Sequence, residues 1–266
     1  MAGRFHTTSR ASLALALGLT LSTTAFADPW NGFYVGASAG GAWGSGDFAT
    51  SAGEVTASSY FSDERNIAFI ERDTSGRSRS SAFSGGLQLG ANQRFNQIVF
   101  GAEIDFGAFD LNGSRSGAGV PYHNFPNLLY TASASYSTDW LLTGRGRLGW
   151  LATPNTLLYF TGGLALSDVK ASNNFFDKSA ITGIILARGA SSNTRTKAGY
   201  TLGGGVEASL WGPWSIKAEY LYVDLGKVST SGIIVPPVGP TRSPLDTSVD
   251  LTANIARVGI NYSFGN

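Results

Sequence analysis

Residues 140–150, WLLTGRGRLGW, alternate between two kinds of side chain. Trp140 and Trp150 occupy even positions together with two leucines, whereas Arg145 and Arg147 occupy odd positions. A helix is disfavoured here, because each of the three glycines costs about 1 kcal/mol relative to alanine. In a β-strand, successive side chains point to opposite faces. The segment therefore predicts a strand with one apolar and one charged face, either half-exposed in a soluble sheet or facing something other than protein.

The same alternation recurs along the chain and predicts an all-β protein. Glycine is abundant, with 35 residues, and charged residues make up 14% of the chain, below the usual quarter. Glycine and aromatic residues without long apolar runs are typical of β structure with many turns. Eight segments carry the pattern, approximately at residues 32–44, 82–95, 97–110, 138–152, 155–168, 197–210, 214–226 and 249–264.

The connections between these segments also alternate, between short and long. Three are tight, around residues 95–97, 153–155 and 210–214. Four are long and polar, near residues 45–81, 111–137, 169–196 and 227–248. Loops of this length are unusual in a compact soluble domain, and a soluble sandwich or jelly roll would scatter its loop lengths. Short turns at one end and long loops at the other are expected of an outer-membrane barrel. We therefore predict an eight-stranded antiparallel up-and-down transmembrane β-barrel with four long extracellular loops and both chain ends on the periplasmic side.

The N-terminus predicts export. Arg4 and Arg10 precede a short apolar run at 11–21, and the small-residue site Ala25-Phe26-Ala27 follows, as in a secretory signal peptide cleaved after Ala27. We predict a signal peptide at 1–27 and one barrel domain at 28–266. Removing 1–27, which holds two of the 19 basic residues and none of the 18 acidic ones, leaves a net charge of −1. This charge disfavours nucleic-acid binding, and the absence of cysteine excludes disulfides and thiolate metal sites.

Aromatic residues near the predicted strand ends suit the two membrane interfaces. Trp140 and Trp150 are ten residues apart on one face, or roughly 33 Å along a strand that rises about 3.3 Å per residue. A tilt of about 40° reduces this to roughly 25 Å, the height of the apolar band of a barrel. The predicted aromatic girdle consists of Trp30, Trp43, Trp140, Trp150, Trp211 and Trp214.

The same alternation along each strand predicts which charged side chains point into the barrel. Four acids and four bases fall near the middle of strands: Glu103, Asp105, Arg145, Arg147, Glu207, Lys217, Glu219 and Arg257. An eight-stranded barrel is just wide enough for side chains to fill, and an isolated buried ion costs several kcal/mol, so these charges need partners. Three interpretations stay open: a salt-bridged structural plug, a narrow water-filled path lined by charge, and stored acid–base chemistry.

An enzymatic function is not indicated. Outer-membrane hydrolases and acyltransferases typically pair a serine with a histidine base, whereas only His123 follows residue 27, in a long loop. No metal-ligand cluster or nucleotide-binding loop is visible in the sequence, and we expect no cofactor. Tyr122, His123 and Phe125 form the only cluster that hints at haem or ligand capture by the loops.

Several motifs, in order and at strand spacing, resemble those of one family. WNGFYVGASAGGAWG at 30–44, FSGGLQLGANQRF at 83–95, IVFGAEIDF at 98–106, WLLTGRGRLGW, LYFTGGLAL at 158–166, WSIKAEYLYVDLG at 214–226 and ARVGINYSF at 256–264 closely resemble the RopB-type, twenty-five-kilodalton outer-membrane proteins of alphaproteobacteria. That family is akin to the eight-stranded membrane domain of OmpA. The match covers essentially all strands and fails in the long loops.

This resemblance implies a surface protein of the bacterial outer membrane that supports envelope integrity and contacts the host or environment. Members are also described as porin-like, so a small diffusion channel is the alternative, and related proteins bind haemin. The expected partners are outer-membrane lipid, the barrel insertion machinery and host or environmental ligands at the loops; the oligomeric state stays open. Tyr262 and Phe264 match the C-terminal insertion signal of such barrels, although Gly265 and Asn266 follow the aromatic that usually ends the chain.

Overall fold

The structure, a computed structural model, describes residue 28 and residues 30–264. The predicted signal peptide, Gly265 and Asn266 lie outside the described residues. The elements are β1 (Gly32–Ser51), α1 (Glu64–Thr74), β2 (Gly76–Phe95), β3 (Ile98–Phe109), β4 (Asn112–Pro121), β5 (Leu128–Thr138), β6 (Trp140–Thr153), β7 (Thr156–Ser179), β8 (Ile185–Ser209), β9 (Trp214–Ile234) and β10 (Ser243–Ser263). The only helix among the described residues, α1, is too short and polar to cross a membrane.

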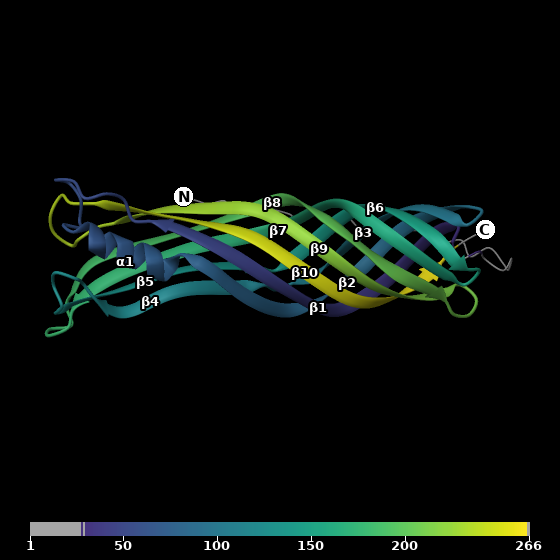
Figure 1. Ribbon diagram of the computed structural model, residues 1–266, viewed down its shortest axis with the longest axis horizontal. Helices are drawn as coiled ribbons and strands as arrows, with labels where there is room; N and C mark the ends of the chain where they lie inside the picture. The colour runs from purple at the N-terminus through teal and green to yellow at the C-terminus, as the bar shows by residue number, and fades with distance from the viewer. Residues whose placement is uncertain (1–27, 29, 265–266) are drawn as a thin grey trace, which may run out of the picture.

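Eight antiparallel strands close into a ring at the end where β1 begins and β10 ends. Their order around the ring is β1-β2-β3-β6-β7-β8-β9-β10, and β10 pairs back onto β1. Short turns at 96–97, 154–155 and 210–213 join neighbouring strands at this end, and Asn96 adopts a positive φ of 58° in the first. Figure 1 shows these strands strongly tilted in the right-hand half of the molecule. The predicted eight-stranded barrel is therefore present; we call this half the basal barrel.

The described chain has ten strands rather than eight, because two of the eight long strands are interrupted. The chain leaves the ladder at Asp110 and Leu111, between β3 and β4, and at Asp139, between β5 and β6. At this level the backbone amide of Phe109 donates to the carbonyl of Asp139 at 3.1 Å, and the amide of Thr138 donates to that of Leu111 at 2.8 Å. These bonds keep both interrupted strands in line.

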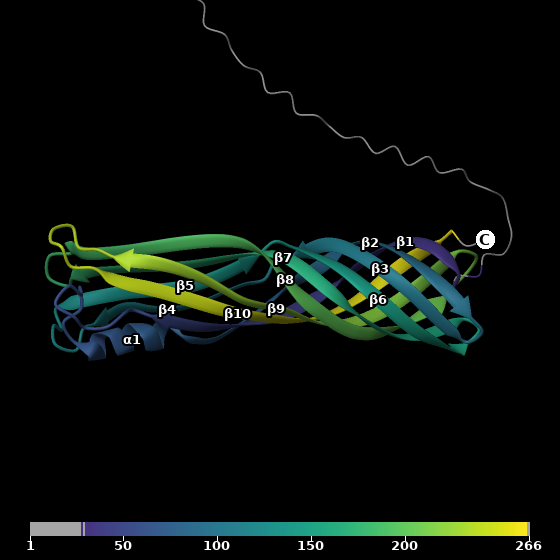
Figure 2. The ribbon, with the colours of Figure 1, turned by 90° about the horizontal axis from the view of Figure 1, so that it is seen from above.

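The strands continue far beyond the predicted bounds, into the four long connections. The segments that actually join the distal strand ends are 52–75, which contains α1, and 122–127, 180–184 and 235–242. Both views show long strands reaching the left-hand end, where they run nearly along the long axis (Figures 1 and 2). The long connections therefore lie at one end, as expected, but most of their residues form strands.

The reason is that alternation persists along each strand while its polarity inverts. In the basal part of β10, Arg257 points inward and Ile260 outward. In the distal part, Leu251 and Ile255 point inward and Asp250 outward. The sequence pattern of a membrane strand, with an apolar outer face, therefore ends where the polarity inverts, although the strand itself continues. The distal half has the pattern of a water-soluble β structure, with an apolar interior and a polar exterior.

In the distal half the ring opens along two seams and becomes a sandwich. On the side away from β1, β2 pairs with β3 only from Ser84 onward, and in the described chain β4 pairs only with β5. Likewise, β8 pairs with β9 only from Tyr200 onward, apart from one bridge between Arg188 and Val235. Two four-stranded sheets result, β2-β1-β10-β9 and β4-β5-β7-β8, whose inner faces share one core. We call this half the distal sandwich.

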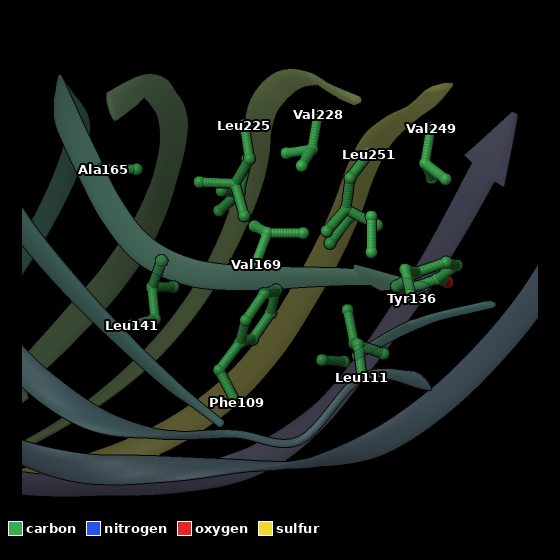
Figure 3. Packing of buried hydrophobic residues seen from close by; sticks show 14 of the residues in the cluster. Phe109, Leu111, Tyr136, Leu141, Ala165, Val169, Leu225, Val228, Val249 and Leu251 are labelled. Carbon is green, nitrogen blue, oxygen red and sulfur yellow. The ribbon is translucent and has the colours of Figure 1, made fainter. Parts of the chain in front are cut away.

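The core of the distal sandwich lies directly above the charged residues of the basal barrel. Figure 3 shows Phe109, Leu141, Val169, Leu225 and Leu251 pointing into one space from β3, β6, β7, β9 and β10. A second apolar cluster lies nearer the tips and includes side chains of α1. The interior beyond the charged layer is therefore filled with apolar side chains.

Helix α1 covers the tip end of the seam between β1–β2 and β4. Asp63 caps its N-terminus by accepting a hydrogen bond from the backbone amide of Arg65 at 2.9 Å. Ile67 and Ile70, three residues apart, are buried in the second cluster. At its C-terminal end, Arg115 of β4 donates from Nε to the carbonyl of Ser75 at 3.0 Å. The helix thus replaces a strand where the sheet is open.

Candidate functional site

The eight charged residues predicted on the inner face all lie buried inside the basal barrel. They come from β3, β6, β8, β9 and β10, which are consecutive around the ring except for β7, the strand between β6 and β8. Register places some opposite each other, as with Glu103 and Arg145, Glu207 and Lys217, and Glu219 and Arg257. Others meet across the lumen, so the set forms one layer.

Arg145 is the centre of this layer. Its Nη1 donates to Oε2 of Glu219 at 3.0 Å, and its Nη2 donates to Oδ2 of Asp105 at 2.8 Å and also contacts Glu103. Its side chain is fully buried. A guanidinium suits this position, because its planar set of donors can serve three carboxylates at once.

Arg257 and Lys217 complete the central group. Arg257 donates from Nε to Oε1 of Glu219 at 2.9 Å and from Nη1 to Oδ1 of Asp105 at 3.1 Å. Lys217 places its Nζ 2.9 and 3.0 Å from the two carboxylate oxygens of Glu103. Three bases and three acids therefore neutralise one another across the lumen.

The remaining pair, Arg147 and Glu207, lies beside this group. Arg147 contacts Glu207 and stacks on the ring of Tyr159, with 3.7 Å between its guanidinium carbon and the ring centroid. Glu207 also accepts hydrogen bonds from Ser215 Oγ at 2.5 Å and Asn261 Nδ2 at 2.7 Å. Because a buried carboxylate is costly without such partners, each of these contacts stabilises the ionised form.

Two inward tyrosines belong to the site and were not predicted. Tyr34 donates its hydroxyl to Oε2 of Glu103 at 2.7 Å, and Tyr159 donates to Oε2 of Glu219 at 3.0 Å. A side chain on Gly90 would collide with the ring of Tyr34, and one on Gly205 with that of Tyr159, so both glycines make room for these rings. An inward aromatic opposite a glycine on the neighbouring strand is the signal that could have identified them.

Apolar layers cover the charged layer on both sides. The core of the distal sandwich lies on one side, and Trp30, Val99, Leu151, Leu157 and Tyr159 form a cluster at the turn end. The charges are therefore shielded from solvent at both ends of the lumen. Such a layer can hold eight strands together; the described chain has no group of three or more His, Cys, Asp or Glu residues placed to hold a metal ion.

Comparison with known proteins agrees with this architecture. The family described as "Outer membrane protein beta-barrel domain" matches residues 11–264. The chain belongs to this outer-membrane barrel family. It is therefore a protein of the bacterial outer membrane, and the apolar outer face of the basal barrel is its lipid-facing surface.

Named relatives come from alphaproteobacteria. The 31 kDa outer-membrane immunogenic protein of Brucella melitensis is 32% identical over 236 residues, which cover 88% of this chain and 84% of that protein. The 22 kDa outer membrane protein of Rhizobium leguminosarum bv. viciae is 30% identical over 198 residues, 74% of this chain and 65% of that protein. Among solved structures, OprG of Pseudomonas aeruginosa aligns with a TM-score of 0.43 and 12% identity, covering 88% of this chain and 97% of that one.

Five of the six predicted girdle tryptophans of this outer-membrane barrel point outward. Trp43, Trp150 and Trp211 are exposed, and Trp140 and Trp214 are half-buried on the outer surface. Trp43 and Trp140 lie toward the distal sandwich, and the other three lie at the turn end. Their outward direction and two levels are those expected of girdles at the two membrane interfaces, where an amphipathic indole is favourable.

Trp30 is the exception, and its prediction as a girdle residue was wrong. It is 0% exposed, and its indole nitrogen donates to the carbonyl of Pro154 at 3.1 Å. Trp30 precedes β1, so strand alternation does not govern its direction, and the barrel end offers an apolar cluster together with the carbonyl of Pro154 as acceptor. It closes the periplasmic end of the outer-membrane barrel instead of facing lipid.

The predicted C-terminal insertion signal lies on the lipid-facing surface. The rings of Tyr262 and Phe264 are 5.0 Å apart, and Tyr262 also packs against Trp214 at 5.1 Å. The amide of Phe264 donates to the carbonyl of Phe33 at 2.7 Å. The last described residues are therefore joined to β1 and complete the closure of the ring.

The loop cluster proposed for haem or ligand capture does not converge. The side chain of Tyr122 is buried, with its hydroxyl donating to Asp177 at 2.8 Å, whereas Phe125 is exposed. His123 lies on the surface, with Nε2 3.1 Å from Arg65 and Nδ1 3.6 Å from Asp63. The three side chains do not face one common space, so this arrangement gives no support to a shared ligand site.

Proposed function

We propose that this protein is a sealed outer-membrane barrel that anchors the distal sandwich at the cell surface and supports the envelope, rather than a diffusion channel. The observation that carries the proposal is the layered interior. Four acids and four bases pair with one another across the lumen, and apolar clusters lie above and below them. An ion would have to displace partners from several buried carboxylates to pass, at a cost of several kcal/mol for each uncompensated charge.

The orientation follows from the two ends of the molecule. Outer-membrane barrels have short periplasmic turns and longer extracellular connections. The turns at 96–97, 154–155 and 210–213 would therefore face the periplasm, and the distal sandwich with α1 would extend outside the cell. The polar outer face of the distal sandwich and its apolar core suit an aqueous surrounding.

Conductance in a planar lipid bilayer tests the sealed barrel. The chain without its predicted signal peptide, residues 28–266, is refolded and inserted, and insertion is verified by protease protection. We expect a silent membrane. Reproducible current steps whose size changes in Glu103→Gln or Arg145→Gln would overturn the proposal and establish the small channel instead.

A surface role is proposed from the architecture and the relatives together. The distal sandwich presents four tips, at 52–75, 122–127, 180–184 and 235–242, and a relative from Brucella is named an outer-membrane immunogenic protein. We also propose membership of the narrower RopB-type group, supported by the alphaproteobacterial relatives and the motif order. Labelling intact cells with a membrane-impermeant reagent on a cysteine at Thr182 tests the exposure; labelling only after lysis would contradict it.

A further inference from the structure

A polar cleft crosses the outer wall of the distal sandwich just above the membrane. Its volume is about 540 Å³, and it extends from β2 across the open seam to β4, β5 and β7. Its lining contains no carboxylate: it consists of Ser78, Arg79, Asn112, Gly113, Ser114, Ser135, Tyr136, Ser137, Lys170 and Ser172. The cleft is thus lined by hydroxyl and amide groups, with a cation at each end.

The two cations are available to a ligand. Arg79 on β2 and Lys170 on β7 are both exposed, and neither has an ion-pair partner among the described residues. Nearby Arg77, by contrast, is paired with Asp47 at 2.9 Å. Strands β4 and β5 lie between them, and because β2 is not hydrogen-bonded to β4, Arg79 and Lys170 are separated by at least three strand spacings, or roughly 14 Å or more at about 4.8 Å each.

The height of the cleft above the hydrocarbon core indicates which part of a membrane molecule could reach it. On β2 the apolar outer face ends at Phe83, and on β7 at Leu166, each four residues nearer the membrane than the cation on the same strand. Trp43, a predicted girdle residue on β1, pairs with Ser81, so Arg79 lies only two residues beyond the girdle, or roughly 5 Å in height at a tilt of about 40°. A headgroup layer is about 5–7 Å thick on each side of the bilayer. The cleft therefore lies at the level of phosphate-bearing headgroups.

We propose that this cleft binds a phosphorylated saccharide of about two sugar rings, with negative charges at both ends held by Arg79 and Lys170. Serine hydroxyls and the amide of Asn112 can donate to and accept from sugar hydroxyls. Arg79 can bind a phosphate through two parallel hydrogen bonds, whereas Lys170 acts as a point charge. The inference rests on the orientation proposed above but not on whether the lumen conducts.

One row below the cleft, three carboxylates mark its lower border. Asp110, Asp139 and Asp168 lie side by side on the outer surface, each two residues nearer the membrane than Asn112, Ser137 and Lys170. Asp168 accepts a hydrogen bond from Thr196 Oγ1 at 2.6 Å. These groups repel a phosphate, so a ligand held directly by the two cations stays above them.

Two binding arms test the site with the refolded protein of residues 28–266. In the first, fluorescent lipid A, a glycolipid whose disaccharide carries phosphates at both ends, is titrated against the protein in detergent micelles. In the second, the same bisphosphorylated disaccharide without its acyl chains is titrated as a free saccharide, with the disaccharide lacking both phosphates as the uncharged comparison. We expect Arg79→Gln/Lys170→Gln to weaken binding at least tenfold, whereas Arg79→Lys/Lys170→Arg retains most of it. Binding in the first arm alone identifies a glycolipid headgroup, and binding in both identifies a saccharide that need not be membrane-bound.

The matched control removes two exposed cations from the opposite seam. Arg195→Gln/Lys227→Gln changes the net charge equally but does not alter the cleft, and should bind like the unmodified protein. Circular dichroism and heat-modifiable electrophoretic mobility verify folding of every variant. The proposal is overturned if the unmodified protein binds neither probe, or if both double variants lose affinity equally. It is also overturned if Asp168→Asn weakens binding, because the phosphate would then be held through a bridging cation.

Discussion

Arg147 lies over the ring of Tyr159, 3.7 Å from its centroid, while its guanidinium contacts Glu207, so one side chain makes both a cation–π contact and an ion pair inside the lumen. Such a buried pair depends on both members. Removing one leaves an uncompensated charge and typically costs about 3–5 kcal/mol, whereas replacing both with apolar or neutral groups is often neutral.

Arg147→Met should therefore lower the free energy of unfolding by about 3–5 kcal/mol, because Glu207 would stay buried without its cation. Arg147→Met/Glu207→Gln should recover most of this loss. Urea unfolding in detergent micelles, followed by tryptophan fluorescence, measures both. If the double variant is as unstable as the single one, the pair is not the source of the effect.

The cluster at the periplasmic end gives a second prediction. Trp30→Ala should destabilise the barrel by about 3–5 kcal/mol, because it removes a large buried ring and its bond to Pro154. Trp30→Phe should cost less, since it keeps an aromatic ring in the cluster. Trp211, which is 68% exposed on the outer surface, provides the matched control, and Trp211→Ala should change stability much less. Thermal unfolding of the three variants, measured by circular dichroism, decides the order.

The face on which each basal-strand residue lies could be predicted from the sequence, because lipid favours apolar side chains and the lumen favours polar ones at alternate positions. Arg145 and Leu148 differ by an odd number of positions, and they lie on opposite faces as predicted. The pairing partners were not readable. That Arg145 contacts Glu219, 74 residues away, depends on the curvature that brings β6 and β9 across the lumen from each other.

The distal sandwich was missed because its strands have the polarity of a soluble sheet. Inward residues such as Val169 and Phe175 keep the period of two, but their outer neighbours are polar, as in a soluble sheet rather than a membrane strand. Helix α1 carried a readable signal, with Asp63 as N-cap and Ile67 and Ile70 three residues apart, inside a segment interpreted as a loop. Trp30 offered no signal, because its direction is set by the closed barrel end and not by a strand.

Depth in the membrane provides a third prediction. Leu164 pairs with Gly144, about midway between Trp140 and Trp150, and is 67% exposed to the lipid side. Leu164→Arg should cost about 2–4 kcal/mol, the usual penalty for a cation near the bilayer midplane. Leu148, two residues from Trp150, lies near the interface, and Leu148→Arg should cost only about 0–1 kcal/mol. Folding into lipid vesicles under a urea gradient measures the difference; equal costs would place the midplane elsewhere.

A buried carboxylate near the tips makes the distal sandwich sensitive to pH. Asp177 is fully buried, and the hydroxyls of Tyr60 and Tyr122 donate to its Oδ2 at 2.6 and 2.8 Å. Burial raises the pKa of Asp177 above its ordinary value of 3.8, although the two hydroxyl bonds oppose the shift. The folded state therefore favours the protonated carboxyl. Its contribution to stability is fully present below the ordinary pKa and is lost as pH rises through the raised pKa.

The segment that carries Tyr60 should accordingly be held more tightly as pH falls toward the ordinary pKa of Asp177. Hydrogen exchange of the amides in 52–63, or cleavage of this segment by a protease active over a wide pH range, should be slower at mildly acidic than at neutral pH. Asp177→Asn keeps a group that can accept both tyrosine hydroxyls but cannot ionise, so it should remove this pH dependence while keeping the fold. Exchange rates that change with pH equally in Asp177→Asn, after correction for intrinsic exchange, would assign the dependence to another group.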